Sequence, residues 1–89
     1  MAFLIGELIG IDIELGKTKN VFTAFFLVKF SEKKYCNMGY KPLTDSAKKV
    51  IAKSKKNTFF LCDVGKDNDG NWKIFNVYKN LEKLDEVLK

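Results

Sequence analysis

The stretch that most constrains the fold is residues 41–64, KPLTDSAKKVIAKSKKNTFFLCDV, because two structural periods meet there head to tail. Its first part has apolar residues at the spacing of one helical face and lysines on the other faces. That apolar set is Leu43, Ala47, Val50 and Ile51. From Thr58 onward the pattern becomes a run of aromatic and aliphatic residues, which is typical of a buried strand. We therefore expect one helix that leads directly into one buried strand.

The expected helix has recognisable ends. Pro42 keeps the residue before it extended, and Thr44 or Asp45 can accept a hydrogen bond from the free N–H groups of the first turn. The lysines near the other end suit the negative end of the helix dipole. Asn57 can adopt the left-handed conformation that often ends a helix.

Length and composition predict one globular domain in a reducing compartment. A chain of 89 residues suffices for a single core, and its content of 46% apolar and 30% charged residues argues against disorder. Cys36 and Cys62 lack the spacing of a CxxC motif, and the sequence has no histidine to complete a common zinc site. The first ten residues lack a basic leader, and Glu7 interrupts their apolar run. We expect a cytoplasmic protein without metal, cofactor, secretion signal or membrane span.

The charge of the chain favours a polyanionic partner. The formal net charge is +5, and all sixteen basic residues are lysines. Lysine is a point charge that suits phosphate, whereas arginine is the forked donor that reads guanine edges. Lysines that only solvate the surface would account for part of this charge equally well.

Residues 3–15 alternate like a half-buried strand. One face is apolar and the other carries glycines and carboxylates: Ile5, Ile9, Ile11, Ile13 and Leu15 against Gly6, Gly10, Asp12 and Glu14. Glycines inside a strand often mark a bulge. We expect this strand to bend near Gly6 or Gly10.

Residues 21–30, which follow the turn GKTKN, show the clearest alternation. One face is apolar throughout and is assigned to the core: Phe22, Ala24, Phe26, Val28 and Phe30. Phe25, Leu27 and Lys29 are then expected on the outer face of the sheet. If Cys36 and Met38 in the strand at 35–40 point inward, Tyr35 lies beside Phe25 on the outer face of the sheet.

The end of the chain predicts a hairpin and a short helix. Asp69-Gly70 within GKDNDGN is a hairpin signal, and residues 72–79 follow it as a strand whose two faces are equally mixed. Asn80 can cap a last helix. Its apolar stripe would contain Leu81, Leu84 and Leu88.

This order of elements closes most economically as a mainly β, five-stranded OB-fold barrel of type β-β-β-α-β-β. It would occupy residues 1–80, with an amphipathic helix at 81–89 packed on the barrel or at an interface. The segment AxxVIAxSKK, an Asn turn and TFFLCDV resembles the helix and fourth strand of single-stranded-DNA-binding proteins of the bacterial and phage type. TAFFLVKF takes the place of their second strand, and WKIFNVYKNLEKL resembles their fifth strand and the closing segment that follows it.

Two departures narrow the resemblance to small phage or mobile-element members of that family. The loop at 65–71 is much shorter than the long DNA-wrapping hairpin of the bacterial tetramers, and no acidic tail follows. The resemblance implies binding of single-stranded DNA, with RNA as the alternative, in replication or recombination. Lysines would neutralise phosphates while bases stack on aromatic rings, each stack contributing about 1 to 3 kcal/mol. The residues expected in these roles are Lys17, Lys19, Phe25, Lys29, Tyr35, Lys66 and Trp72.

These residues also have a purely structural interpretation. Phe25 can lie beneath the C-terminal helix, Trp72 can plug the core or its rim, and Tyr35 and Tyr40 can fill an edge strand. A second functional hypothesis is a protein-interaction or oligomerisation domain, such as a homodimer, built on the aromatic face and the C-terminal helix. Lysines around the aromatic face would favour nucleic acid, and burial of that face against another chain would favour interaction.

The sequence predicts no enzyme. The DNDG stretch resembles part of a calcium loop, but Asn76 would stand where that loop needs a glutamate, so a tight turn is expected. Glu7, Asp12 and Glu14 lie near glycines without a histidine or an activated nucleophile. No glycine-rich loop that could cradle a phosphate is present.

Overall fold

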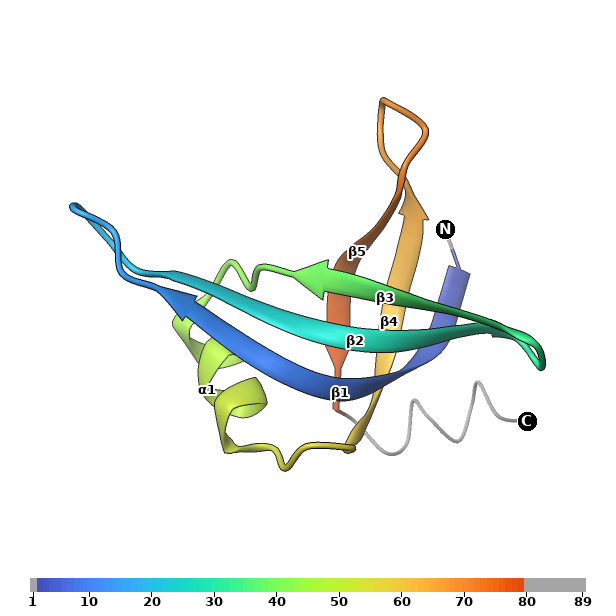
Figure 1. Cartoon of the computed structure of the whole chain (residues 1–89), viewed down its shortest axis with the longest axis horizontal. Coiled ribbons are helices and arrows are strands. Elements are labelled where there is room, and N and C mark those ends of the chain that lie inside the picture. The colour runs from blue at the N-terminus through green and yellow to red at the C-terminus, as the bar shows by residue number, and fades with distance from the viewer. Residues whose placement is uncertain (1, 80–89) are drawn as a thin grey trace.

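The computed structural model describes residues 2–79, and within that range the chain forms five strands and one helix in the expected order (Figure 1). The elements are β1 (Ala2–Glu14), β2 (Val21–Ser31), β3 (Lys34–Tyr40), α1 (Asp45–Lys53), β4 (Phe59–Lys66) and β5 (Trp72–Tyr78). The helix expected at 81–89 lies outside the described residues. Within residues 2–79, no helix has the length and apolar character needed to cross a membrane.

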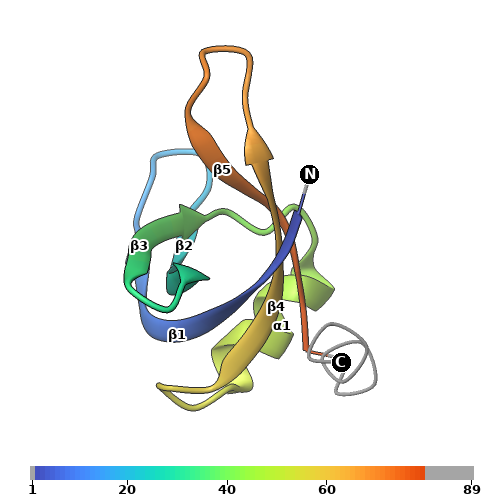
Figure 2. The same ribbon diagram turned by 90° about the vertical axis from the view of Figure 1, so that its right-hand side faces the viewer.

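The strands form one antiparallel sheet of order β3-β2-β1-β4-β5, which curls into a half-barrel (Figure 2). β1 pairs with β4 through residues 2–7 and with β2 through residues 6–14, so it borders two parts of the sheet. The expected bend is confirmed, because the β1–β2 register shifts between Leu8 and Gly10. Across the open side, the Tyr40 hydroxyl donates a hydrogen bond of 3.4 Å to Asn76 Oδ1, linking β3 to β5.

The core lies on the concave side of the sheet, and the alternation predicted for β2 is confirmed. Ala24, Phe26 and Val28 are fully buried, whereas Phe25 and Leu27 are half-buried and Lys29 is exposed. The rings of Phe26 and Phe60 meet edge to face at 5.3 Å between centroids, a favourable aromatic geometry. β3 also alternates as predicted, with Met38 and Tyr40 buried and Tyr35 exposed.

The single apolar face predicted for β1 is wrong, because Ile5 lies on the outer side of the sheet whereas Ile11 and Ile13 lie on the inner side. Ile11, Ile13 and Leu15 are 38%, 55% and 84% exposed, whereas Leu8, outside that set, is 2% exposed. The bulge reverses the alternation, so that Leu8 faces inward before it and Ile11, opposite Ala24, faces inward after it. Beyond the bulge, β1 and β2 project past the core (Figure 1), and inward-facing residues there have little to pack against.

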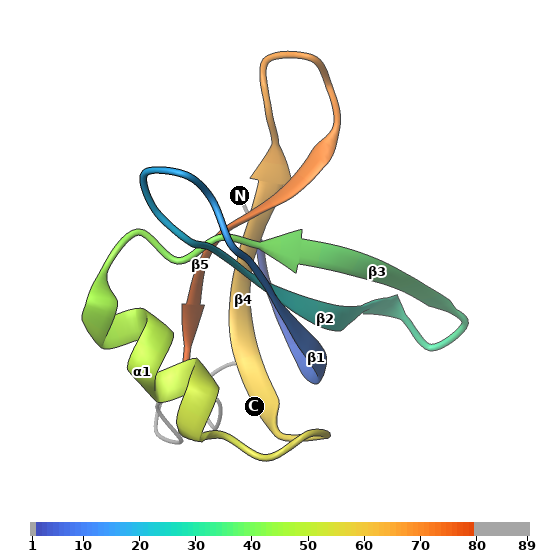
Figure 3. The ribbon, with the colours of Figure 1, turned by 60° about the vertical axis from the view of Figure 1, so that its left-hand side comes forward.

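The helix begins at one of the two predicted caps, since Thr44 Oγ1 accepts a hydrogen bond of 3.1 Å from the Ala47 N–H. α1 lies beside β4 and β5 (Figure 3) and buries Ile51 in the core cluster. The stripe predicted for this helix is only partly correct, because Leu43 precedes α1 and is 93% exposed, and Val50 is 45% exposed. These two side chains remain on the surface.

The turn after α1 is fixed to β1. The helix itself ends at the cap residue Ser54, and Asn57 follows in the predicted left-handed conformation with φ 73°. The Asn57 N–H donates to the Leu8 carbonyl at 2.7 Å, and its side-chain amide donates to the Glu7 carboxylate at 2.6 Å. These bonds set where β4 begins.

A second bulge explains why neither face of β5 looked apolar throughout. Ile74 pairs with Val64 and Asn76 pairs with Asp63, so Phe75 is the additional residue between them. The inward side therefore changes from Ile74 to Val77 across the bulge.

Candidate nucleic-acid interface

Two surface hollows adjoin where β3 ends and the chain turns toward α1. The larger, of about 520 Å³, is lined by Thr23 and Gly39 on one side and by Lys73 and Phe75 of β5 on the other. The smaller, of about 370 Å³, lies between the β1–β2 loop and the start of α1. Both hollows are lined by Lys41 and Leu43, so they adjoin at these residues, and we call the two hollows together the basic groove.

The basic groove is positively charged. Its lysines come from four separate segments: Lys19, Lys41, Lys48 and Lys73. Among the described residues, none that lines either hollow is acidic. Ammonium groups gathered in a concave surface bind anions as point charges and raise the local concentration of a polyanion.

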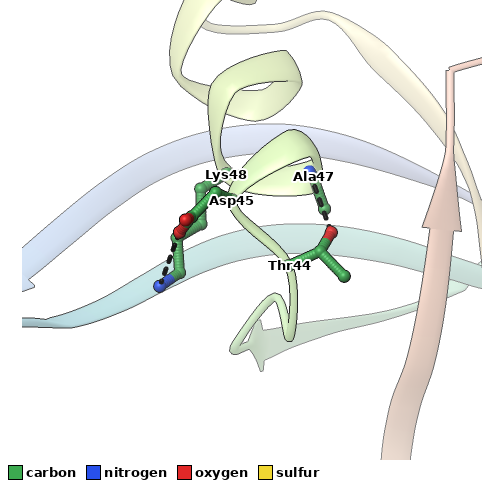
Figure 4. Close-up of polar contacts among 4 residues, drawn as sticks. All are labelled: Thr44, Asp45, Ala47 and Lys48. Atoms are coloured by element: carbon green, nitrogen blue, oxygen red, sulfur yellow. Dashed lines mark hydrogen bonds and ion pairs between the residues drawn. The ribbon is translucent and has the colours of Figure 1, made fainter.

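One of these lysines has an acidic neighbour. Lys48 Nζ lies 3.8 Å from Asp45 Oδ1, one helical turn apart at the start of α1 (Figure 4). Asp45 is almost fully exposed, and an exposed pair of this kind contributes little because solvent screens it. Lys48 is therefore able to exchange this partner for a phosphate.

The β1 side of the groove has an acidic border. Asp12 lies opposite Thr23 and Glu14 opposite Val21 in the β1–β2 ladder, and both carboxylates are exposed. Like charges repel, so a polyanion is directed away from β1 and toward β3 and β5.

Aromatic rings lie in and beside the groove. Phe75 lines it from the β5 bulge and is partly exposed. On the neighbouring outer face of β2, the Phe25 ring lies over Gly39, because a Cβ atom placed there would be 3.6 Å from Phe25 Cε1. Gly39 has no side chain, so the Phe25 ring packs beside the backbone of β3 at this position.

The structure brings three of the predicted site residues onto one surface. Lys29 and Tyr35 are direct cross-strand partners on β2 and β3, and both are exposed. Phe25 lies on the same outer side, opposite Gly39. The aromatic and basic outer face predicted for β2 and β3 is therefore present.

Lys66 and Trp72 form a different cluster, on the side of β5 opposite to Lys73. They are cross-strand partners, with Lys66 Nζ 5.5 Å from the centroid of the Trp72 ring. Trp72 also meets Phe30 edge to face at 5.3 Å, and Lys34 Nζ lies 5.6 Å from the Phe30 ring. Trp72 thus has the structural role of a partly exposed rim residue as well as a cation–π contact.

The loop lysines separate from the other predicted residues. The β1–β2 loop and the β2–β3 turn lie at opposite ends of the sheet (Figure 1), so Lys17 and Lys19 are distant from Lys29 and Tyr35. Lys19 lines the basic groove, whereas Lys17 is exposed on the loop.

Sequence reasoning missed most of the groove. The sequence analysis did not predict that Lys41, Leu43, Lys48, Lys73 and Phe75 belong to the site. In the sequence, Lys48 resembles the other lysines on the helix surface. Phe75 enters the groove because of a bulge in β5, which the sequence pattern does not reveal. The sequence signal available was at Lys41, a basic residue between the end of a strand and a proline.

Two side chains of the core have raised pKa values. Burial raises the pKa of the Cys62 thiol to about 12. Burial also raises the pKa of the Tyr40 hydroxyl, with smaller contributions from Tyr78 and Cys62. Neither group is charged near neutral pH, so the charge of the groove comes from its lysines.

In residues 2–79, no three Cys, Asp or Glu side chains come together as a metal site.

Comparison of the chain with protein-family models, with curated proteins and with solved structures gives no significant match in any of the three. Function is therefore inferred from the groove and the surfaces beside it.

Proposed function

We propose that this protein binds single-stranded nucleic acid in the basic groove without reading base sequence, with DNA as the expected ligand. The observation that carries the proposal is the convergence of Lys19, Lys41, Lys48 and Lys73 on two adjoining hollows, the larger of which also contains Phe75. Lysines neutralise successive phosphates, and rings accept unstacked bases of any identity. In a duplex the bases are already stacked, so the rings favour the single strand.

The topology supports an OB-fold assignment. An OB-fold is a partly open, five-stranded Greek-key barrel whose second and third strands and adjoining loops bind oligonucleotides. Here the order β3-β2-β1-β4-β5 and the Tyr40–Asn76 link between β3 and β5 fit such a barrel, opened between those two strands. The groove lies against β2 and β3, and Lys19 reaches it from the β1–β2 loop. Lys29 and Tyr35 would extend the surface along the outer face.

The test is a titration of a labelled dT oligonucleotide by fluorescence anisotropy, with a duplex and a U oligonucleotide of equal length as controls. Four phosphate contacts predict that the logarithm of the binding constant falls with the logarithm of salt at a slope of about −3. The single strand should bind more tightly than the duplex. Absence of binding at low salt, or equal binding of both forms, would refute the proposal.

Matched variants locate the site. Lys41→Ala/Lys73→Ala removes two groove lysines, and Lys49→Ala/Lys56→Ala removes two exposed lysines that line neither hollow. We expect the groove variant to lose at least about tenfold in affinity and to reduce the salt slope by about 1.4. The control variant should change both quantities much less. Equal losses would mean that diffuse charge, and not the groove, attracts the oligonucleotide.

A second candidate function is protein–protein association, for which the exposed Ile11, Ile13 and Leu15 provide the specific observation. A row of exposed apolar residues on a projecting strand is typical of an interface. A homodimer formed there would be detected by solution mass measurement without nucleic acid. A monomer at all accessible concentrations would exclude it.

A further inference from the structure

The second half of β1 has one edge without a neighbouring strand. β4 pairs with β1 only through residues 2–7. Next along β1, the Leu8 N–H donates to the Thr58 carbonyl at 2.9 Å, and the Leu8 carbonyl accepts from the Asn57 N–H at 2.7 Å. Over residues 10–14, β1 pairs with β2 alone among the described residues, and we call the other edge of this segment the open edge. Alternate residues of a strand point their N–H and C=O groups to opposite sides, so the open edge presents backbone groups that a further strand can bind.

The inner side of the open edge is apolar and exposed. In the β1–β2 ladder Ile11 lies opposite Ala24 and Ile13 lies opposite Phe22. Leu15 continues this spacing just beyond the strand. The exposed fraction rises along the row, from 38% at Ile11 to 55% at Ile13 and 84% at Leu15. This apolar row is therefore largely open to solvent.

The outer side of the open edge is acidic. Asp12 and Glu14 lie two residues apart on that side, and both are exposed. Neither carboxylate has a hydrogen bond or an ion pair within residues 2–79. A strand that binds here meets apolar side chains on one side and unpaired carboxylates on the other.

The two carboxylates act against pairing of this edge with a second copy of the chain. Antiparallel pairing of two open edges would bring Asp12 and Glu14 of both copies together on one face, because cross-strand neighbours share a face of the sheet. Like charges in that position are destabilising, and charged residues commonly protect exposed edges in this way. The same carboxylates attract a strand of the opposite charge.

We infer that the open edge binds an extended segment of a partner protein in which apolar residues alternate with lysine or arginine. Such a segment bonds the free backbone groups as an added strand, and its apolar side chains cover Ile11, Ile13 and Leu15. Its cations lie opposite Asp12 and Glu14. The formal net charge of +5 repels a basic segment from most of the remaining surface. This inference builds on the second candidate function, association through the exposed residues of β1, and does not depend on oligonucleotide binding.

The test uses the full-length protein without oligonucleotide and the capped, rhodamine-labelled peptide Val-Lys-Val-Lys-Val-Lys-Val, with binding followed by fluorescence anisotropy. Two control peptides separate charge from pattern. One replaces every lysine by glutamate, and the other keeps the composition but groups the lysines together. We expect the alternating lysine peptide to bind at least about tenfold more tightly than either control.

Methylation of the peptide nitrogens tests whether the peptide binds as a strand. In an added strand the valines point their N–H groups to one side and the lysines point theirs to the other. Of two peptides, one methylated on the valine nitrogens and one on the lysine nitrogens, one should lose at least about tenfold in affinity and the other should retain most of it. Bound peptide should also slow amide hydrogen exchange within residues 10–14 of the protein.

Charge reversal locates the site. Asp12→Lys/Glu14→Lys should weaken binding of the lysine peptide at least about tenfold and should bind the glutamate peptide instead. Glu32→Lys/Asp69→Lys makes the same change in net charge at exposed positions in two turns away from the open edge, and should change both affinities much less. Circular dichroism melting of both variants verifies that they are folded.

The proposal requires all of these results from a protein that is a monomer of 10.2 kDa without peptide. Absence of binding at about 1 mM lysine peptide would overturn it. Equal losses from the two methylated peptides, or equal losses in the two charge-reversal variants, would show that binding is diffuse and would also overturn it. A dimer without peptide, with amide protection at residues 10–14, would assign the open edge to a second copy instead. Because no oligonucleotide is present, each of these failures is distinct from a failure of nucleic-acid binding in the basic groove.

Discussion

Replacing Gly6 by alanine tests how closely β1 and β4 are packed. A Cβ atom at Gly6 would lie 2.6 Å from Cys62 Sγ, well inside the shortest approach that real Cβ atoms make. The added methyl group cannot move aside easily, because the same Cβ position lies 3.4 Å from Phe26 Cβ and 3.5 Å from Val28 Cγ2. Cys62 is itself fully buried, so its sulfur cannot turn toward solvent without disturbing the core. The substitution therefore overpacks the core.

Overpacking of this kind costs about 1 to 3 kcal/mol, which corresponds to a fall in melting temperature of roughly 5 to 20 °C for a domain of this size. Gly10→Ala is the matched control in the same strand, since nothing lies within 4 Å of a Cβ atom there. We expect that control to be neutral or slightly stabilising.

Removing the clashing atom should relieve the cost. In Gly6→Ala/Cys62→Ala the new methyl group takes the place of the sulfur, so the double variant should unfold at a higher temperature than Gly6→Ala alone. Urea unfolding of the four proteins gives the coupling free energy directly. A Gly6→Ala protein as stable as the parent, or one that Cys62→Ala does not restore, would refute the packing described for β1 and β4.

The remaining predictions concern the thiols, the start of α1 and the groove. A maleimide at neutral pH should label Cys36 before Cys62, because burial raises the pKa of the Cys62 thiol to about 12 and suppresses its thiolate; mass spectrometry showing Cys62 labelled first would contradict this. Thr44→Ala should lower the free energy of unfolding by about 1 kcal/mol through loss of the Thr44–Ala47 hydrogen bond, whereas Thr44→Ser should not; equal urea midpoints for all three proteins would contradict it. Phe75→Ala should weaken oligonucleotide binding by about 1 to 3 kcal/mol at an unchanged melting temperature, and unchanged anisotropy titrations would remove Phe75 from the site.

The order of elements could be predicted because each segment carries its own period. The uninterrupted apolar set of β2 predicted which of its residues lie on each face of the sheet. The change of period after Asn57 predicted where the chain leaves α1 and enters β4. The bulges in β1 and β5 could not be predicted in the same way. A bulge depends on the register with a partner strand, so the reversals at Leu8 and Phe75 are not written in the alternation of either strand alone.

Apart from Lys19 in the β1–β2 loop, the candidate site was predicted only where it lies within one hairpin. Phe25, Lys29 and Tyr35 share the outer face of β2 and β3, and that sharing follows from local alternation. Lys41 and Lys73 are distant in sequence and meet only because the sheet curls until β3 approaches β5. No periodic pattern reports such a closure.

The central claim, that the basic groove holds a single strand, is tested most directly by chemical-shift mapping of the ¹⁵N-labelled protein with a short dT oligonucleotide. The account predicts that the largest amide shifts fall on residues of the groove, Thr23, Gly39, Lys41, Leu43, Lys73 and Phe75. Smaller shifts should extend to Lys29 and Tyr35 on the outer face. Shifts concentrated on Lys49, Lys53, Lys55 and Lys56, which line neither hollow, or no shifts at a saturating oligonucleotide concentration, would contradict it.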